Sequence, residues 1–138
     1  MEYPDDLYYT TDHLWIRLAG DRGTIGITDF AQQELGELLY VDLPEKGASL
    51  DESEVFGSLE SAKTVVELFT PVSGEVTGTN EDLEDEPSLV NDDPYGKGWL
   101  MHLLVGDVKE IEDLMSAADY EEYLEKEEKG DGARIGRA

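Results

Sequence analysis

Apolar residues along the chain gather in short clusters that glycine, proline and acidic residues separate. Short apolar clusters bounded by turn-forming residues predict β-strands rather than long helices. The predicted strands are residues 14–18, 24–28, 38–43, 55–59, 64–70 and 99–105, and a further strand begins within 71–76. The first two strands flank a turn at 19–23 that contains glycine and aspartate, so they are expected to form a hairpin.

A short helix is predicted over residues 29–35, with Asp29 as its N-cap, Phe30 and Leu35 facing the core, and Gly36 at its end. Residues 81–93 are predicted to be a loop, because seven of these thirteen positions are acidic and Pro87 interrupts them. Many short strands followed by helix favour a mainly β fold, a compact sandwich or barrel capped by helices.

From Asp107 the apolar residues recur at helical spacing. Residues 116–119 are expected to divide this region into two helices. The apolar positions of the first stretch are Val108, Ile111, Leu114, Met115 and Ala118, and those of the second are Tyr120, Tyr123 and Leu124. The chain reads as a single domain over residues 1–130, followed by a flexible C-terminal tail at 131–138.

The chain is strongly acidic, with 34 Asp and Glu against 10 Lys and Arg and a formal net charge of −24. Such a charge repels phosphate backbones and anionic membranes, so neither a nucleic acid nor a membrane is expected as a partner. The acid excess runs through the whole chain. It indicates either a solvated surface or, as we favour, a protein from a halophilic organism with a salt-rich cytoplasm.

The sequence contains no cysteine, which excludes disulfides, thiolate metal sites and a cysteine nucleophile. Any dithiol that the protein uses must therefore belong to a cofactor. The first residues are neither basic nor apolar, and no apolar run approaches the length of a membrane span. A cytoplasmic location is expected.

Lys63 is the first candidate functional residue, because it lies between the predicted strands 55–59 and 64–70, at or beside the tip of a hairpin. A lysine in a turn is usually only a solvated charge. Lys63 is, however, one of six lysines in the chain, and its neighbours Ser61, Ala62 and Thr64 are small. An accessible amine at a hairpin tip can be acylated, and a long cofactor on it would act as a tether.

The other candidates are weaker. Glu60 and Glu67 flank Lys63, and both could simply be surface acids. Alternatively, Glu60 could be recognised by an attaching enzyme, and Glu67 could bind a charged amine. His13 and His102 lack the spacing of a metal site, and no metal is expected. No nucleophile elbow, phosphate loop or dinucleotide motif occurs, so no catalytic residues are predicted.

The segment Glu60-Ser61-Ala62-Lys63 resembles the lipoylation site of glycine cleavage H proteins, typically Glu-Ser-Val-Lys. Further matches follow at the family's spacing and extend the resemblance over roughly Tyr9 to Tyr123. They are Gly26 to Gln32, Leu35 to Glu37, Val41 to Pro44, Pro71 to Val76, Leu89 to Asn91, Asp93 to Gly96, and Gly98 with Trp99. Several ordered motifs are far more specific than one short pattern.

The resemblance implies a barrel-sandwich hybrid, in which two antiparallel sheets present the lipoyl lysine on a hairpin and helices pack at the C-terminus. It implies a non-catalytic carrier with lipoic acid in amide linkage to Lys63, where Glu60 and Ser61 would serve recognition by the lipoate-attaching enzyme. The lipoyl arm would carry an aminomethyl group from glycine decarboxylase, the P protein, to aminomethyltransferase, the T protein. Dihydrolipoamide dehydrogenase would then reoxidise the dithiol. A monomer is expected.

Two positions depart from the family pattern. Leu14 stands between His13 and Trp15, where the family usually has an acid that helps to hold the amine of the loaded arm. Asp12 is a candidate substitute for this missing acid. Glu67 and Asp12 are thus the two expected contacts of the loaded arm. Ala62 replaces the usual valine, and lipoylation is expected to survive this small change.

Three other readings compete with the shuttle. The chain could be a lipoyl relay that passes lipoyl groups to other complexes. It could be an acidic interaction module that is never modified. A biotin carrier is disfavoured, because Ala62 and Thr64 replace the methionines of Ala-Met-Lys-Met.

Overall fold

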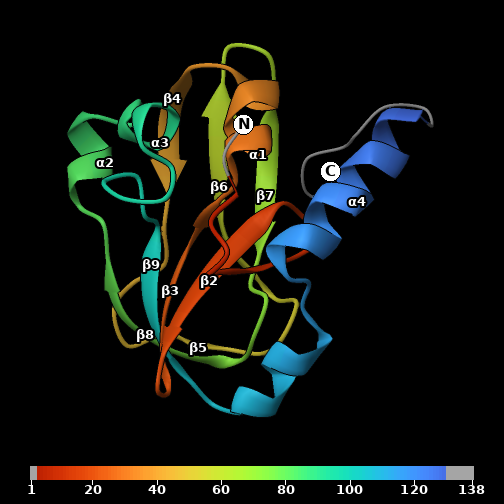
Figure 1. The fold of residues 1–138 in the computed structure, drawn as a ribbon. Helices are drawn as coiled ribbons and strands as arrows, with labels where there is room; N and C mark the ends of the chain where they lie inside the picture. The colour runs from red at the N-terminus through yellow and green to blue at the C-terminus, as the bar shows by residue number, and fades with distance from the viewer. Residues whose placement is uncertain (1–2, 130–138) are drawn as a thin grey trace.

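A computed structural model describes residues 3–129 of the chain, which fold into two antiparallel sheets and several short helices (Figure 1). The six-stranded sheet has the order β1-β2-β3-β9-β8-β5, and the three-stranded sheet has the order β4-β6-β7. The strands are β1 Tyr8–Tyr9, β2 Leu14–Ala19, β3 Arg22–Ile27, β4 Leu38–Asp42, β5 Ser49–Leu50, β6 Val55–Ser61, β7 Val65–Phe69, β8 Gly74–Thr79 and β9 Met101–Val105. The predicted β architecture and the β2–β3 hairpin are confirmed.

The core lies between the two sheets, where the inward side chains of both belong to one buried cluster. Leu59 and Val66 are opposite each other on β6 and β7, and both are buried. On β9, buried and exposed residues alternate, so Leu103 points inward while His102 points outward. This alternation leaves an outer face on each sheet, and the sites described below lie on those faces or at their ends.

Helix α1, Asp29–Leu35, follows β3 directly, but its N-cap is Thr28 and not the predicted Asp29. The Thr28 hydroxyl accepts a hydrogen bond from the Ala31 amide at 3.2 Å, whereas Asp29 is the first helical residue. Threonine is a good N-cap as well, and an acid in the first turn is favoured by the helix dipole. The predicted end at Gly36 is confirmed, since its amide donates to the Gln32 carbonyl with a φ of 76°.

The predicted loop at 81–93 is wrong, because this segment contains two one-turn helices, α2 Asp82–Asp85 and α3 Leu89–Asp92. Each is anchored by a single buried residue, Leu83 or Val90. A single buried apolar residue in each helix cannot produce a helical periodicity of apolar positions in the sequence. The acidic residues of this segment are exposed to solvent. In Figure 1, α2 and α3 lie on the opposite side of the sheets from α4, Ala117–Lys129.

The C-terminal region divides as predicted, but its first part is a 3-10 helix, Val108–Asp113, and not an α-helix. Ile111 is buried, whereas Val108 is 48% exposed and Ala118 is exposed, so the expected continuous apolar stripe is absent there. In α4 the buried residues include Tyr120 and Leu124, as the second stretch predicts. The expected tail at 131–138 lies outside the described residues. Within the described chain, no helix has the length and apolar character needed to cross a membrane.

Candidate cofactor-attachment site

Lys63 lies in the three-residue connection, residues 62–64, between β6 and β7. We call residues 61–64, which include the last residue of β6, the lysine hairpin. The Ser61 amide donates to the Thr64 carbonyl at 2.9 Å and closes the hairpin. The Ser61 hydroxyl accepts hydrogen bonds from the amides of Lys63 at 3.2 Å and Thr64 at 3.3 Å. The buried Ser61 side chain therefore fixes the backbone that presents Lys63, as serine hydroxyls do in tight turns.

The amine of Lys63 is exposed, as the position at the hairpin tip predicts. The ion pair found among the described residues joins Lys126 to Glu122 and does not involve Lys63. The lysine stem passes over Gly36, where a Cβ would lie 3.7 Å from Lys63 Cε and 3.8 Å from Nζ. In Figure 1 the turn that joins β6 to β7 lies beside α1, the helix that Gly36 ends.

Glu60 and Glu67 lie on the outer face of the three-stranded sheet, on either side of the hairpin connection. Glu60 is opposite both Tyr40 and Val65, and Glu67 is opposite Ser58. Glu60 is half-buried and Glu67 is exposed. Because directly opposite residues share a face, the two carboxylates are diagonal neighbours on one surface that ends at Lys63. That surface also exposes Tyr40 and Val65, which are 68% and 54% accessible.

Asp12 lies in the turn between β1 and β2, on the six-stranded sheet, and not on the lysine hairpin. Its amide donates to the Thr10 hydroxyl at 3.2 Å, and its side chain is half-buried. Leu14, which stands in place of the usual acid, is 1% exposed and belongs to the core between the sheets. The structure thus places Glu60, Ser61, Lys63 and Glu67 on one hairpin. Asp12 lies on a different element.

Asn91 on α3 is a residue at this site to which the sequence analysis gave no role of its own. Its Nδ2 donates to the Gly36 carbonyl at 2.8 Å and to Gln32 Oε1 at 3.2 Å, while its Oδ1 accepts from the Leu38 amide at 3.0 Å. Asn91 therefore joins the end of α1 to the start of β4, next to the lysine hairpin. Leu38 is in turn paired with Ser61. A half-buried side-chain amide that bridges two elements has no local sequence signature.

The N-terminus of α1 is anchored by a second polar group, also without a sequence signature. The Tyr120 hydroxyl on α4 lies 2.8 Å from His13 Nδ1 and 2.8 Å from the Thr28 hydroxyl. Burial raises the pKa of Tyr120, so its hydroxyl stays protonated and can donate to one partner while it accepts from the other. His13 is buried in a left-handed conformation with φ 66°, packed against aromatic rings, which gives it a structural role.

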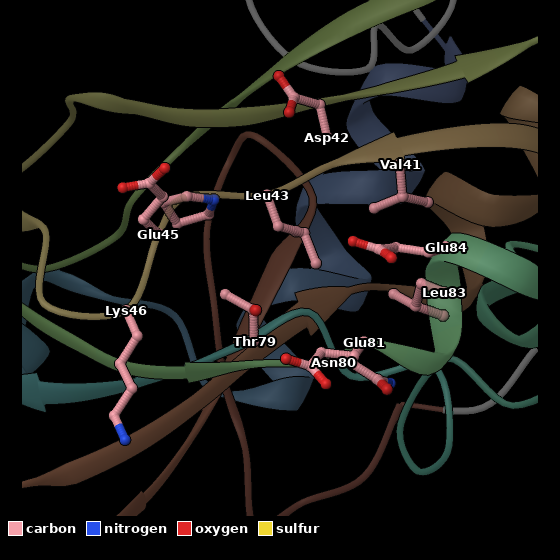
Figure 2. Close-up of a pocket in the computed structure, with 11 residues that line it drawn as sticks. Val41, Asp42, Leu43, Glu45, Lys46, Thr79, Asn80, Glu81, Leu83 and Glu84 are labelled. Atoms are coloured by element: carbon pink, nitrogen blue, oxygen red, sulfur yellow. The ribbon is translucent and has the colours of Figure 1, made fainter.

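A large hollow, of about 350 Å³, does not belong to this site (Figure 2). It lies between the end of β4 and the segment that leads into α2, and Asp42, Glu45, Glu81 and Glu84 are among its lining residues. None of Asp12, Glu60, Ser61, Lys63 and Glu67 lines it. The described residues also contain no group of His, Asp and Glu suited to hold a metal ion.

A two-sheet domain that presents an exposed lysine on a β-hairpin has the architecture of a carrier domain. The chain belongs to the glycine cleavage H-protein family, because the model of that family matches residues 7–127. Members of this family are non-catalytic subunits of the glycine cleavage system and carry lipoate. The chain is accordingly a carrier and not an enzyme.

Individual relatives agree with the family match. The chain is 50% identical over 127 residues to the glycine cleavage system H protein of Rubrobacter xylanophilus, covering 92% of this chain and 98% of the relative. It is 47% identical over 127 residues to that of Bacillus subtilis, covering 92% and 100%. The crystal structure of a glycine cleavage system H protein from Mycobacterium marinum superposes with a TM-score of 0.82 at 37% identity, covering 88% of this chain and 98% of that one. The predicted barrel-sandwich fold is thereby confirmed.

Proposed function

We propose that Lys63 carries a lipoyl group as an amide on Nζ, and that the chain shuttles an aminomethyl group from glycine decarboxylase to aminomethyltransferase. Dihydrolipoamide dehydrogenase then restores the oxidised carrier. The observation that carries the proposal is the presentation of Lys63, whose exposed amine stands at a hairpin tip without an ion pair among the described residues. The lipoyl group, when bound, supplies the redox dithiol that a chain without cysteine lacks.

The residues of the hairpin fit this attachment. An attaching enzyme must reach Nζ, and the small Ala62 and Thr64 leave the backbone on both sides of Lys63 accessible. Ser61 holds the turn through its two accepted hydrogen bonds. Glu60, on the outer face of β6, is proposed as the recognition element for the attaching enzyme, together with the Ser61 turn. Acylation removes the charge of Lys63 and converts its flexible stem into part of a tether.

Glu67 and Asp12 are proposed to hold the amine of the cargo. A carboxylate accepts charge-assisted hydrogen bonds from an ammonium group, and these are stronger than neutral ones. Glu67 is exposed on the same face as Glu60, two positions beyond Val65, and is therefore within reach of a flexible arm that starts at Lys63. Asp12 would take over the function of the acid that Leu14 replaces.

The proposed working unit is one domain, residues 1–130, that acts as a monomer in the cytoplasm. The outer face of the three-stranded sheet is acidic and carries Asp42, Glu60 and Glu67. We propose that the glycine cleavage enzymes and the lipoate-attaching enzyme approach the chain at the hairpin end of this face.

The test is reconstitution with purified glycine decarboxylase after lipoylation in vitro. Lys63→Arg keeps the charge and length but cannot form the amide, and Lys46→Arg is a matched control on an exposed turn lysine. Exchange of labelled bicarbonate into glycine should require the wild-type chain or Lys46→Arg and should vanish with Lys63→Arg. A wild-type chain that is lipoylated but supports no exchange contradicts the shuttle and favours the lipoyl relay. A chain that never accepts lipoate contradicts the carrier role itself.

A further inference from the structure

The outer face of the six-stranded sheet carries a hollow of about 310 Å³ that the lipoyl function does not use. Its lining residues come from β2, β3, β8 and β9 and include Arg17, Arg22, Thr24, Thr77 and His102. Arg17, Thr24 and His102 form one cross-strand row, since Arg17 is opposite Thr24 and Thr24 is opposite His102. The hollow is therefore built on paired strands and not on a loop, with Thr77 at the register shift of β8. We call it the arginine hollow.

The charge of the arginine hollow is the reverse of that of the chain. The sequence contains four arginines, and the two that lie in the described residues, Arg17 and Arg22, both line it. The chain has 34 acidic residues, yet neither arginine forms an ion pair with a carboxylate of the described residues. Two guanidinium groups that remain uncompensated on so acidic a surface point to an anionic ligand from outside the chain.

Arg17 is held in place for such a ligand. Its Nη2 donates to the Tyr95 carbonyl at 3.1 Å, and its guanidinium lies 5.1 Å from the centre of the Trp15 ring. These contacts fix the plane of the guanidinium and leave other N–H groups to donate. Arg22, at the start of β3, is exposed and can close on a ligand from the rim.

The remaining lining residues are hydrogen-bonding groups suited to oxygen atoms. His102 Nδ1 lies 3.0 Å from the Thr24 hydroxyl, and the His102 ring stacks on Trp99 at 4.0 Å. Partial burial lowers the pKa of His102, which favours the neutral ring. When the Thr24 hydroxyl donates to Nδ1, the ring proton is on Nε2, which can then donate to an anion. Thr77 adds a second hydroxyl.

We propose that the arginine hollow binds a small organic phosphate. Two arginines, a histidine and two hydroxyls offer more donors than a carboxylate has oxygens, and they match the three terminal oxygens of a phosphate monoester. The volume is about ten times the ~30 Å³ of a water molecule, which leaves space for a small organic group beside the phosphate. The site lies on the other sheet from Lys63, so ligand binding does not require the lipoyl arm.

The test is an NMR titration of the full-length chain with glycerol phosphate and, separately, with inorganic phosphate, at constant ionic strength kept with potassium chloride. Saturable shifts should appear at the amides of Thr24, Thr77 and His102. Arg22→Gln should weaken the binding about tenfold, as expected for one charge-assisted hydrogen bond. Lys109→Gln removes one positive charge from the exposed 3-10 helix and should leave the affinity unchanged.

Saturation by glycerol phosphate with weaker binding of inorganic phosphate supports the organic ligand, and equal binding of both contradicts that part of the proposal. Shifts that are linear, that chloride reproduces, or that Arg22→Gln and Lys109→Gln reduce equally would show screening of surface charge and overturn the site. Circular dichroism spectra of both variants, recorded in the same buffer, establish that each retains the fold.

Discussion

The side chain of Lys63 passes over Gly36, whose missing Cβ would lie 3.7 Å from Lys63 Cε and 3.8 Å from Nζ. The glycine that ends α1 thus also supports the proposed attachment lysine. Its φ of 76° independently requires glycine, because L-residues rarely adopt such a conformation. One residue therefore both terminates the helix and lies against the lysine stem.

Gly36→Ala should lower the free energy of unfolding by about 1–3 kcal/mol, because a φ of 76° with a ψ of −164° is a backbone conformation essentially restricted to glycine. It should also slow lipoylation, because the new methyl group contacts the stem of Lys63. Gly20→Ala is the matched control, since Gly20 has a φ of 65° but no atom within 4 Å of the added Cβ. Urea unfolding and a timed attachment assay measure the two effects. If both variants are lipoylated at the same rate, the contact between residue 36 and Lys63 does not affect lipoylation.

Ser61→Ala should loosen the lysine hairpin, because the amides of Lys63 and Thr64 lose their shared acceptor. The expected loss of stability is about 1 kcal/mol, as for other lost side-chain caps of backbone amides. Hydrogen exchange at the Thr64 amide should accelerate, and Ser61→Thr should restore protection. Ser58→Ala, on the outer face of the same strand, serves as the control. Unchanged exchange at Thr64 in Ser61→Ala would contradict this account of the hairpin.

Asn91→Ala should destabilise the chain by about 2–3 kcal/mol, because the Leu38 amide and the Gly36 carbonyl both lose their partner. Asn91→Asp keeps the acceptor for Leu38 but removes the donor to Gly36, so it separates the two contributions. Asp92→Ala, at the exposed neighbouring position, should have little effect. Denaturant titrations compare the three variants. Equal stability of Asn91→Ala and Asp92→Ala would show that Asn91 does not join α1 to β4.

Much of the fold follows from sequence because strand alternation and turn residues are local signals. The β2–β3 hairpin, the end of α1 at Gly36 and the position of Lys63 between β6 and β7 all depend on residues close together in the chain. The resemblance to glycine cleavage H-protein motifs extended the fold prediction to the whole domain. Thr28 was missed as the N-cap because the adjacent Asp29 is also a good capping residue.

The features that sequence could not supply join distant segments. Asn91 and Gly36 are 55 residues apart, and Tyr120 and Thr28 are 92 apart, so nothing local marks either contact. The arginine hollow is similar, since Arg17 and His102 meet only through the pairing of β2, β3 and β9. The one-turn helices α2 and α3 are fixed by tertiary burial of Leu83 and Val90.

The folded chain should be more stable in concentrated salt. A net charge of −24 on 138 residues produces strong self-repulsion, which salt screens over a few ångströms at about 1 M. The urea midpoint should therefore rise between dilute buffer and molar potassium chloride, in keeping with the proposed halophilic origin. Native circular dichroism and an unchanged urea midpoint in dilute buffer would contradict this expectation.

The most direct test of the central claim is the intact mass of the chain purified from its native host, followed by peptide mapping. The account predicts a mass increment of one lipoyl group, located on the peptide that contains Lys63. A bare Lys63 in cells with active lipoate attachment would contradict the account.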